Sequence, residues 1–233
     1  MKRLIITGAS SGIGLAIVKR FRRDGYTVVN ISRHPCPEPG VANLVCDLAQ
    51  PGAADGLGAA LSPWLEFGTQ ICVVHNASAI QLTRVDTLSS ADLRAALELN
   101  LVAPSAINRL LIPHLPPGSS ILFIGSTLAE KAVPGVASYV IAKHGVVGMM
   151  RATCQDLAGR GIHTCMICPG FTDTTMLRSM IGDSAETLAS MTALSAFDRL
   201  IEPDEIADVV AFAAGAPVLN GAVIHANLGQ RER

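Results

Sequence analysis

Short, nearly continuous apolar runs recur along the chain and alternate with segments of helical character. We expect strands at residues 4–7, 27–31, 41–45, 71–74, 121–124, 164–167 and 223–226, and among the helices one at residues 53–65. Strands that are apolar on both faces are typical of a parallel sheet covered by helices on both sides. Crossovers between parallel strands are right-handed. The pattern therefore predicts an α/β fold, with residues 1–233 forming one doubly wound Rossmann domain around a mainly parallel sheet.

The composition agrees with a large buried core. Of the 233 residues, 49% are hydrophobic and 16% are charged, which excludes a disordered chain. The net charge of −1 offers no basic excess for binding nucleic acid. No run of about 18 apolar residues predicts a membrane span, and the apolar run before Gly8 is too short for a signal peptide. We expect a cytoplasmic protein without nucleic-acid or membrane partners.

A glycine-rich turn follows the first strand and opens a helix expected at residues 12–23. Gly8 can adopt a tight turn, Gly12 lets a pyrophosphate approach the backbone, and Gly14 lets the helix pack closely. Free N–H groups at the helix start then face the anion. No Gly-Lys-Ser/Thr follows, so this is not a nucleoside-triphosphate loop. The dinucleotide-binding residues predicted here are Gly8, Ser10, Ser11, Gly12, Ile13 and Gly14.

The end of the second strand indicates which dinucleotide binds. A carboxylate there accepts the ribose 2′-hydroxyl of NAD, but this chain has Ser32 and Arg33. A guanidinium can hold a 2′-phosphate with two hydrogen bonds. We therefore expect NADP(H) to be preferred over NAD(H); the alternative is that Arg33 is an ordinary surface residue. Asp47, with Leu48 beside it, is expected to accept a hydrogen bond from the adenine amino group.

Tyr139 and Lys143 lie four residues apart in a segment expected to be helical, so both side chains share one face. A free tyrosine has a pKa of about 10 and is a poor proton shuttle at neutral pH. A nearby cation lowers that pKa, which makes the phenol a useful acid and base. The same spacing is common in ordinary surface pairs. Its position after a strand that ends near Ser126, in a chain with a glycine-rich turn, favours catalysis.

Taken together, these features resemble the short-chain dehydrogenase/reductase family, including its 3-oxoacyl and carbonyl reductases. The matching positions span most of the chain: residues 7–14, Asp47, residues 75–78, Asn100, Ser126, Tyr139, Lys143 and residues 169–174. The resemblance implies an oxidoreductase that moves a hydride between a nicotinamide cofactor and a carbonyl or secondary alcohol. It also implies a homodimer or homotetramer.

The resemblance implies roles for the catalytic positions. Tyr139 would exchange a proton with the substrate, and Ser126 would hydrogen-bond the substrate oxygen. Lys143 would bind the nicotinamide ribose and lower the pKa of Tyr139. Asn100 would support a water relay toward Lys143. Further cofactor contacts would come from Tyr139 and Lys143 themselves and from Asn76, Ala77, Ser78, Pro169, Gly170, Thr172 and Thr174.

Asn100 also stands out from the residues alone. Together with Leu93, Leu97 and Leu101 it forms one helical stripe, so its polar side chain should be buried and need a partner. Pro104, four residues later, has no N–H for the Asn100 carbonyl. We expect this carbonyl to be free to hold a water; the alternative is a simple kink solvated at the surface.

Two features invite other interpretations. The segment His75-Asn76-Ala77-Ser78 departs from the family's usual Asn-Asn-Ala-Gly, and we expect Ser78 to adjust the pocket. His75 ends a buried strand and is expected to be a structural histidine. Cys165 and Cys168 have the spacing of a redox or zinc motif but lie in an apolar run, so we expect core residues and no metal site.

Several functions remain open on this scaffold. The leading hypothesis is a carbonyl reductase or alcohol dehydrogenase; the alternatives are a 3-oxoacyl thioester reductase, an isomerase or dehydratase, and a nicotinamide-binding regulator without turnover. An apolar lid is expected from Phe171, Met176, Leu177, Met180 and Met191, although core packing is an equal alternative. Its few charges, Asp173, Arg178 and Asp183, suggest a neutral and fairly apolar substrate.

Overall fold

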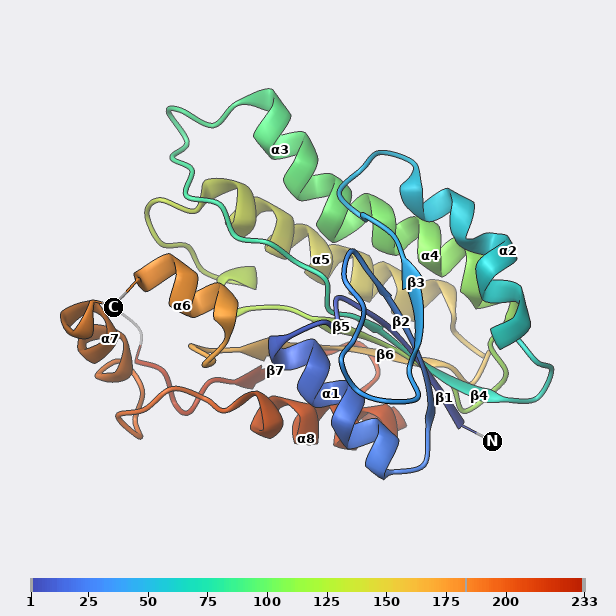
Figure 1. The fold of residues 1–233 in the computed structure, drawn as a ribbon. Coiled ribbons are helices and arrows are strands. Elements are labelled where there is room, and N and C mark those ends of the chain that lie inside the picture. The colour runs from blue at the N-terminus through green and yellow to red at the C-terminus, as the bar shows by residue number, and fades with distance from the viewer. Residues whose placement is uncertain (1, 183, 232–233) are drawn as a thin grey trace.

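The protein is described by a computed structural model that covers residues 2–182 and 184–231. Its centre is a seven-stranded sheet in the order β3-β2-β1-β4-β5-β6-β7, and every neighbouring pair is parallel (Figure 1). The strands are β1 (Lys2–Thr7), β2 (Thr27–Ser32), β3 (Ala42–Val45), β4 (Gln70–His75), β5 (Ser120–Ile124), β6 (His163–Pro169) and β7 (Ala222–Ala226). The predicted α/β doubly wound fold is confirmed, and each expected strand is present.

Helices cover both faces of the sheet (Figure 1). The α-helices are α1 (Gly12–Arg23), α2 (Gly58–Leu61), α3 (Ser90–Leu97), α4 (Ala103–Leu111), α5 (Ala137–Asp156), α6 (Thr175–Ile181), α7 (Ala185–Thr192) and α8 (Pro203–Ala214). On one face, α1 and α8 bury Phe21 and Val210 against alternate strand residues such as Leu4. On the other, α4 and α5 bury Ile107 and Met150 against the sheet.

The helix expected at residues 53–65 is less regular than predicted. It consists of a 3₁₀ turn (Ala53–Leu57), the short α2, and a second 3₁₀ turn (Ser62–Trp64). Gly56, Gly58 and Pro63 lie within this stretch. Glycine has little helical preference and proline lacks an N–H, so both weaken a continuous α-helix.

One long helical stretch changes its winding part way. Between α3 and α4 the chain forms a π-helical turn (Glu98–Val102), so that the Ala103 N–H donates to the Glu98 carbonyl. The combined stretch, Ser90–His114, is long and apolar enough to cross a membrane by length and composition alone. Within it, Ile107 and Leu111 are buried against the sheet, as in the core helices of globular proteins.

The strand order brings four loops to one edge of the sheet. The order reverses direction between β1 and β4, and the loops that leave β1, β4, β5 and β6 all start at the carboxyl ends of their strands. In doubly wound sheets, ligands bind in the crevice outside such a switch point. Most of the predicted site residues lie on or beside these loops, and Ser32, Arg33 and Asp47 lie at or just after the ends of β2 and β3.

Candidate active site

The glycine-rich turn has the backbone that its sequence predicts. Gly8 and Gly12 have φ values of +72° and +54°, a region that residues with a side chain rarely adopt. A Cβ atom at Gly8 would lie 2.8 Å from the Cα of Ala77, which leaves no room for a side chain. Gly14 is equally restricted, because its Cβ would lie 2.4 Å from the Gly8 carbonyl oxygen and 2.5 Å from Asn76 Nδ2. Gly14 thus lets α1 approach the turn and the loop after β4.

Asn76 and Thr7 hold this turn against the loop after β4. The Asn76 amide donates to the carbonyls of Thr7 and Gly8 at 3.0 and 2.9 Å. The Thr7 hydroxyl in turn accepts from the backbone N–H groups of Asn76 and Ala77 at 3.0 and 2.9 Å. The predicted cofactor positions on β1 and β4 therefore form one hydrogen-bonded unit.

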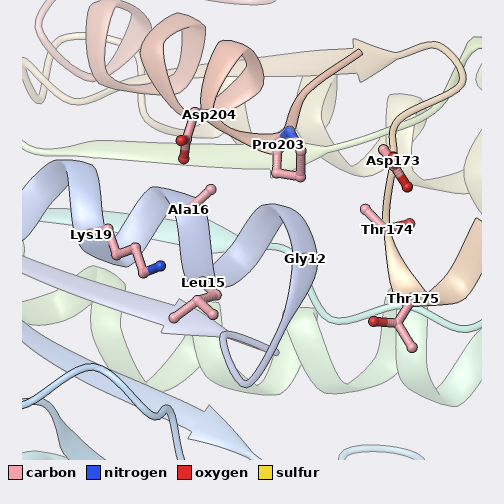
Figure 2. Close-up of a pocket in the computed structure, with 9 residues that line it drawn as sticks. All are labelled: Gly12, Leu15, Ala16, Lys19, Asp173, Thr174, Thr175, Pro203 and Asp204. Atoms are coloured by element: carbon pink, nitrogen blue, oxygen red, sulfur yellow. The ribbon is translucent and has the colours of Figure 1, made fainter. Parts of the chain in front are cut away.

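The start of α1 suits an anion. Ser11 is the N-cap in an extended conformation, its side chain makes no capping hydrogen bond, and the first turn carries no acidic residue. The N–H groups of this turn and the helix dipole therefore favour a pyrophosphate. Figure 2 shows the adjoining pocket of about 280 Å³, in which Thr174 lies opposite Gly12. A Cβ at Gly12 would be 3.2 Å from the Thr174 methyl group.

The end of β2 presents Ser32 and the exposed Arg33 at the same sheet edge. The loop behind them is held by two asparagines that the sequence interpretation missed. Asn30 accepts from the Ala9 N–H at 3.0 Å and donates to Asn43 at 2.9 Å. Asn43 also accepts from the Cys36 N–H at 2.8 Å.

Asp47 follows β3 and is only partly buried. Its carboxylate accepts from the Ala49 N–H at 3.2 Å and from the Gln50 amide at 3.3 Å, while Leu48 is buried in the core. These bonds hold Asp47 at the edge where the adenine is expected, and further acceptor sites of the carboxylate stay open to a ligand.

Tyr139 and Ser126 meet at the ends of α5 and β5. The Ser126 backbone is extended, and its hydroxyl accepts from the Leu128 N–H at 3.1 Å. Burial raises the pKa of Tyr139 to about 12, opposed by the hydrogen bond with the Ser126 side chain. The predicted pair is therefore brought together, but the direction of the Tyr139 pKa shift differs from the expectation. Loss of hydration disfavours the phenolate more than its neighbours favour it.

Lys143 lies one helical turn after Tyr139 and is only 3% exposed. Its ammonium donates to the Ile124 carbonyl at 3.0 Å and lies 5.4 Å from the centre of the Tyr139 ring. Burial lowers the pKa of Lys143 to about 8. The cation is thus close enough to act on the tyrosine, although one of its protons is engaged by the main chain.

Asn100 is 4% exposed and lies in the π-turn, as the polar position on a buried stripe predicted. Its amide donates to the Ala96 carbonyl at 2.9 Å, and its side-chain oxygen accepts from the Ser78 hydroxyl at 2.9 Å. The helix leaves regular α geometry here, four residues before Pro104. The irregularity agrees with a freed Asn100 carbonyl; the water relay itself stays a prediction.

A second pair of hydroxyls, which the sequence interpretation also missed, fixes the start of α5. Thr83 and Ser138 hydrogen-bond through their side chains at 3.0 Å, and the Ser138 N–H donates to the Thr83 hydroxyl at 3.1 Å. The backbone of Thr83 adds bonds with Gly135 and Ala137. Tyr139 follows Ser138 directly. The bonds from Thr83, in the loop after β4, therefore help to fix the position of Tyr139 at the start of α5.

The segment after β6 closes the other side of the site. The Gly170 N–H donates to the Ala226 carbonyl, and the buried Thr172 hydroxyl donates to the Gly170 carbonyl at 3.1 Å. Thr174 caps α6 by accepting from the Leu177 N–H at 3.2 Å. The threonine side chains therefore shape the segment that begins at Pro169.

The apolar residues of the expected lid differ in their exposure. Leu177 is buried and Phe171 is half-buried, whereas Met176 is exposed. The two lid charges within the described residues neutralise each other, because Arg178 donates to both oxygens of Asp173 at 2.7 and 2.6 Å. The third, Asp183, lies outside the described residues.

His75 and the two cysteines of the C-x-x-C spacing are buried in the core. His75 is 6% exposed and hydrogen-bonds Asn108 through Nε2 at 2.8 Å, and burial lowers its pKa to about 4. Cys165 and Cys168 are buried free thiols on β6. In residues 2–182 and 184–231, no cluster of three His, Cys, Asp or Glu side chains is arranged to hold a metal ion.

The chain is similar in sequence to known proteins over most of its length. A family model described as enoyl-(acyl carrier protein) reductase matches residues 8–230. The 3-oxoacyl-(acyl-carrier-protein) reductase FabG of Thermotoga maritima is 27% identical, with 91% of this chain and 90% of that protein covered. The 3beta-hydroxysteroid dehydrogenase of Mediterraneibacter gnavus is 28% identical, with 82% and 74% covered.

A solved structure repeats the fold almost throughout. The short-chain dehydrogenase from Burkholderia cenocepacia J2315 in complex with NADP has a TM-score of 0.85 and 27% identity, and 98% of this chain and 97% of that chain are covered. The site therefore lies on a scaffold shared with enzymes along nearly its whole length. The chain belongs to the short-chain dehydrogenase/reductase family and is an oxidoreductase that transfers a hydride with a nicotinamide cofactor.

Proposed function

We propose that this enzyme uses NADP(H) to interconvert a small carbonyl compound and its secondary alcohol, with Tyr139 as the acid and base and residues 1–233 working as one domain. The observation that supports this most is the meeting of Ser126, Tyr139 and Lys143, at the sheet edge that also carries the glycine-rich turn. A hydroxyl, a phenol and an ammonium around one open edge are suited to holding and protonating a carbonyl oxygen.

In the reducing direction, Ser126 holds the substrate oxygen and Tyr139 donates its phenolic proton to that oxygen. A nicotinamide held in this site would supply the hydride that the carbonyl carbon receives. With a pKa raised to about 12, Tyr139 is fully protonated at neutral pH and is ready as the acid. Lys143 then stabilises the phenolate that forms, and a proton returns to Tyr139 Oη by way of Lys143 and a water at Asn100.

The preference for NADP(H) rests on the end of β2. Arg33 is exposed there, Ser32 precedes it, and no carboxylate follows the strand directly to repel a 2′-phosphate. The similar dehydrogenase from Burkholderia cenocepacia was solved with NADP bound, which agrees with this preference.

The substrate proposed is neutral and largely apolar. Within the described lid residues, Asp173 and Arg178 neutralise each other, and the half-buried Phe171 and exposed Met176 add apolar surface. A 3-oxoacyl thioester is the most specific alternative, supported by the similarity to the 3-oxoacyl-(acyl-carrier-protein) reductase of Thermotoga maritima. A homodimer or homotetramer and a cytoplasmic location stay predictions.

The test is turnover measured by the loss of nicotinamide absorbance, with NADPH or NADH, against ketones, aldehydes, quinones and 3-oxoacyl thioesters. Tyr139→Phe should lower kcat by at least about 100-fold because it removes the proton donor. Its affinity for NADPH should stay close to that of the wild type, since the glycine-rich turn is untouched.

Tyr26→Phe is the matched control, because it removes the same hydroxyl from a ring that packs on Phe21 outside the site. Unchanged turnover in Tyr139→Phe would remove Tyr139 as the acid. Tight NADPH binding without turnover on any compound in the panel would instead count against the proposed substrate class.

A further inference from the structure

Ser78 is where this chain departs from the family pattern, which usually has glycine at this position, and its hydroxyl is engaged. It donates to the Asn100 side-chain oxygen at 2.9 Å. The bond joins two segments that are 22 residues apart in the sequence. A glycine could not make it, so the contact belongs to this chain's own residues.

Two hydrogen bonds together fix the orientation of the Asn100 amide. The Ala96 carbonyl can only accept a hydrogen bond, so Nδ2 must face it, at 2.9 Å. The side-chain oxygen then faces Ser78, and Asn100 is only 4% exposed. Without the Ser78 hydroxyl, this oxygen would be a buried acceptor without its partner.

Ser78 is also attached to the cofactor side of the site. It follows Asn76 and Ala77, whose N–H groups both donate to the Thr7 hydroxyl. Asn76 further donates to the Gly8 carbonyl within the glycine-rich turn. Hydrogen bonds therefore join that turn to Asn76 and Ala77, the main chain leads on to Ser78, and the Ser78 hydroxyl bonds Asn100 in the π-turn.

The Ser78–Asn100 bond can affect the helix because it is made at the π-turn. A π-helical turn is less favourable than regular α-helix and persists where its surroundings hold it. Here the helix is π-helical over Glu98–Val102, and Pro104 has no N–H to donate to a carbonyl in this turn. Ser78 is the side chain outside the helix that the structure shows bonded to Asn100.

We propose that Ser78 is a positioning residue that holds Asn100, and with it the π-turn, in the geometry that returns a proton to the Lys143–Tyr139 pair. The inference rests on the proposed function, because it concerns the proton path of that reaction. Ser78 acts through Asn100 and needs no contact with the substrate.

The kinetic test compares Ser78→Ala with Ser78→Thr. The alanine variant should lower kcat by roughly 10-fold, because a buried acceptor loses its partner and the Asn100 side chain keeps only its bond to the Ala96 carbonyl. The KM for NADPH should change by less than about 2-fold, because alanine keeps the main chain through which this usual glycine position would meet the cofactor. Threonine keeps the hydroxyl and should restore most of the lost rate.

Ser89→Ala is the matched control. Ser89 caps the start of α3, on the same helical stretch, by accepting from the exposed Asp92 N–H at 3.0 Å. Its loss should lower the melting temperature without lowering kcat. If Ser78→Ala changes only the melting temperature, as Ser89→Ala does, the positioning role is wrong.

Double substitution separates action through Asn100 from any other route. If Ser78 acts through Asn100, Ser78→Ala should cost almost nothing in an Asn100→Ala background. A full additional 10-fold loss in that background would overturn the proposal.

Hydrogen exchange tests the inference even if no substrate is turned over. The amides of residues 98–103 should exchange several-fold faster in Ser78→Ala than in wild type or Ser78→Thr, both with and without NADPH. Equal exchange in all three proteins would show that Ser78 does not hold the π-turn. Absent turnover in wild type with this exchange difference intact would instead place the failure in the proposed reaction.

Discussion

At the scale of single residues, the end of β2 combines an exposed guanidinium, Arg33, with two asparagines, Asn30 and Asn43, that hold the loop behind it. Arg33 can be predicted as a cofactor contact from its distance after the glycines, because the residue at the end of the second strand meets the 2′ position of the adenosine ribose. Asn30 and Asn43 were missed, since an asparagine in a strand has no meaning until its partners across the sheet are known. The Ser78–Asn100 bond is of the same kind, because it depends on packing between distant segments.

Arg33 gives a prediction about cofactor choice. Arg33→Asp should weaken NADPH binding by roughly 100-fold and leave NADH binding nearly unchanged, because it replaces a partner of the 2′-phosphate with a like charge. The measurement is the Kd of each cofactor by fluorescence titration.

The matched control for that charge change is Arg151→Asp, which alters an exposed position on α5. It should leave both constants as they are. An equal loss for NADPH and NADH in Arg33→Asp would mean that the side chain does not contact the 2′-phosphate.

At the scale of elements, periodicity predicted the strands and α1 but not the short helices. The strands are continuous apolar runs, and α1 has an apolar stripe, so both are visible in the sequence. The helices α6 and α7 have only 7 and 8 residues, too short for a repeating stripe. The stretch at residues 53–65 is helical, but it is broken into 3₁₀ turns and a short α-helix around its glycines and proline.

The end of β4 gives a prediction at this scale. His75 is buried between Phe123 and Asn108, and burial lowers its pKa to about 4. The unfolded chain binds a proton at its ordinary pKa of about 6.5, whereas the folded chain binds it only near pH 4. Stability contributed by neutral His75 is therefore complete above pH 6.5 and is lost as the pH falls toward 4, by up to about 3 kcal/mol.

His75→Gln should flatten this part of the stability profile, because glutamine can donate to Asn108 without titrating. The measurement is urea unfolding at a series of pH values from 4 to 7. His114→Gln, at an exposed position, should keep the slope of the wild type. A wild-type slope in His75→Gln would assign the acid sensitivity to other groups.

At the scale of the whole molecule, the sheet order explains why distant motifs form one site. Turns that follow β1, β4, β5 and β6 meet at one edge because parallel strands end on the same side. Figure 1 shows helices on both faces of this sheet, which leaves its carboxyl edge to the loops. The motif spacing could predict this meeting, since it follows from topology and not from any single contact.

The whole fold should respond to its cofactor. NADP⁺ at 100 times its Kd should stabilise the folded state by about 2.7 kcal/mol, which is roughly 5–10 °C in Tm for a chain of this length. The reason is that the N–H groups at the start of α1 gain an acceptor that Ser11 does not supply. Thermal unfolding followed by dye fluorescence measures the shift; the same concentration of NAD⁺ should give a smaller one, and no shift with either would contradict a dinucleotide site.

The burial of Lys143 has a consequence for how such an enzyme can be altered. At neutral pH, keeping this ammonium charged inside the protein costs about 3 kcal/mol relative to an unfolded chain, given a pKa near 8 in place of 10.5. Replacing it with methionine would recover part of that cost, less the bond to the Ile124 carbonyl. Selection for heat resistance alone would therefore favour the loss of Lys143, whereas selection for the proposed reaction would keep the lysine at this cost in stability.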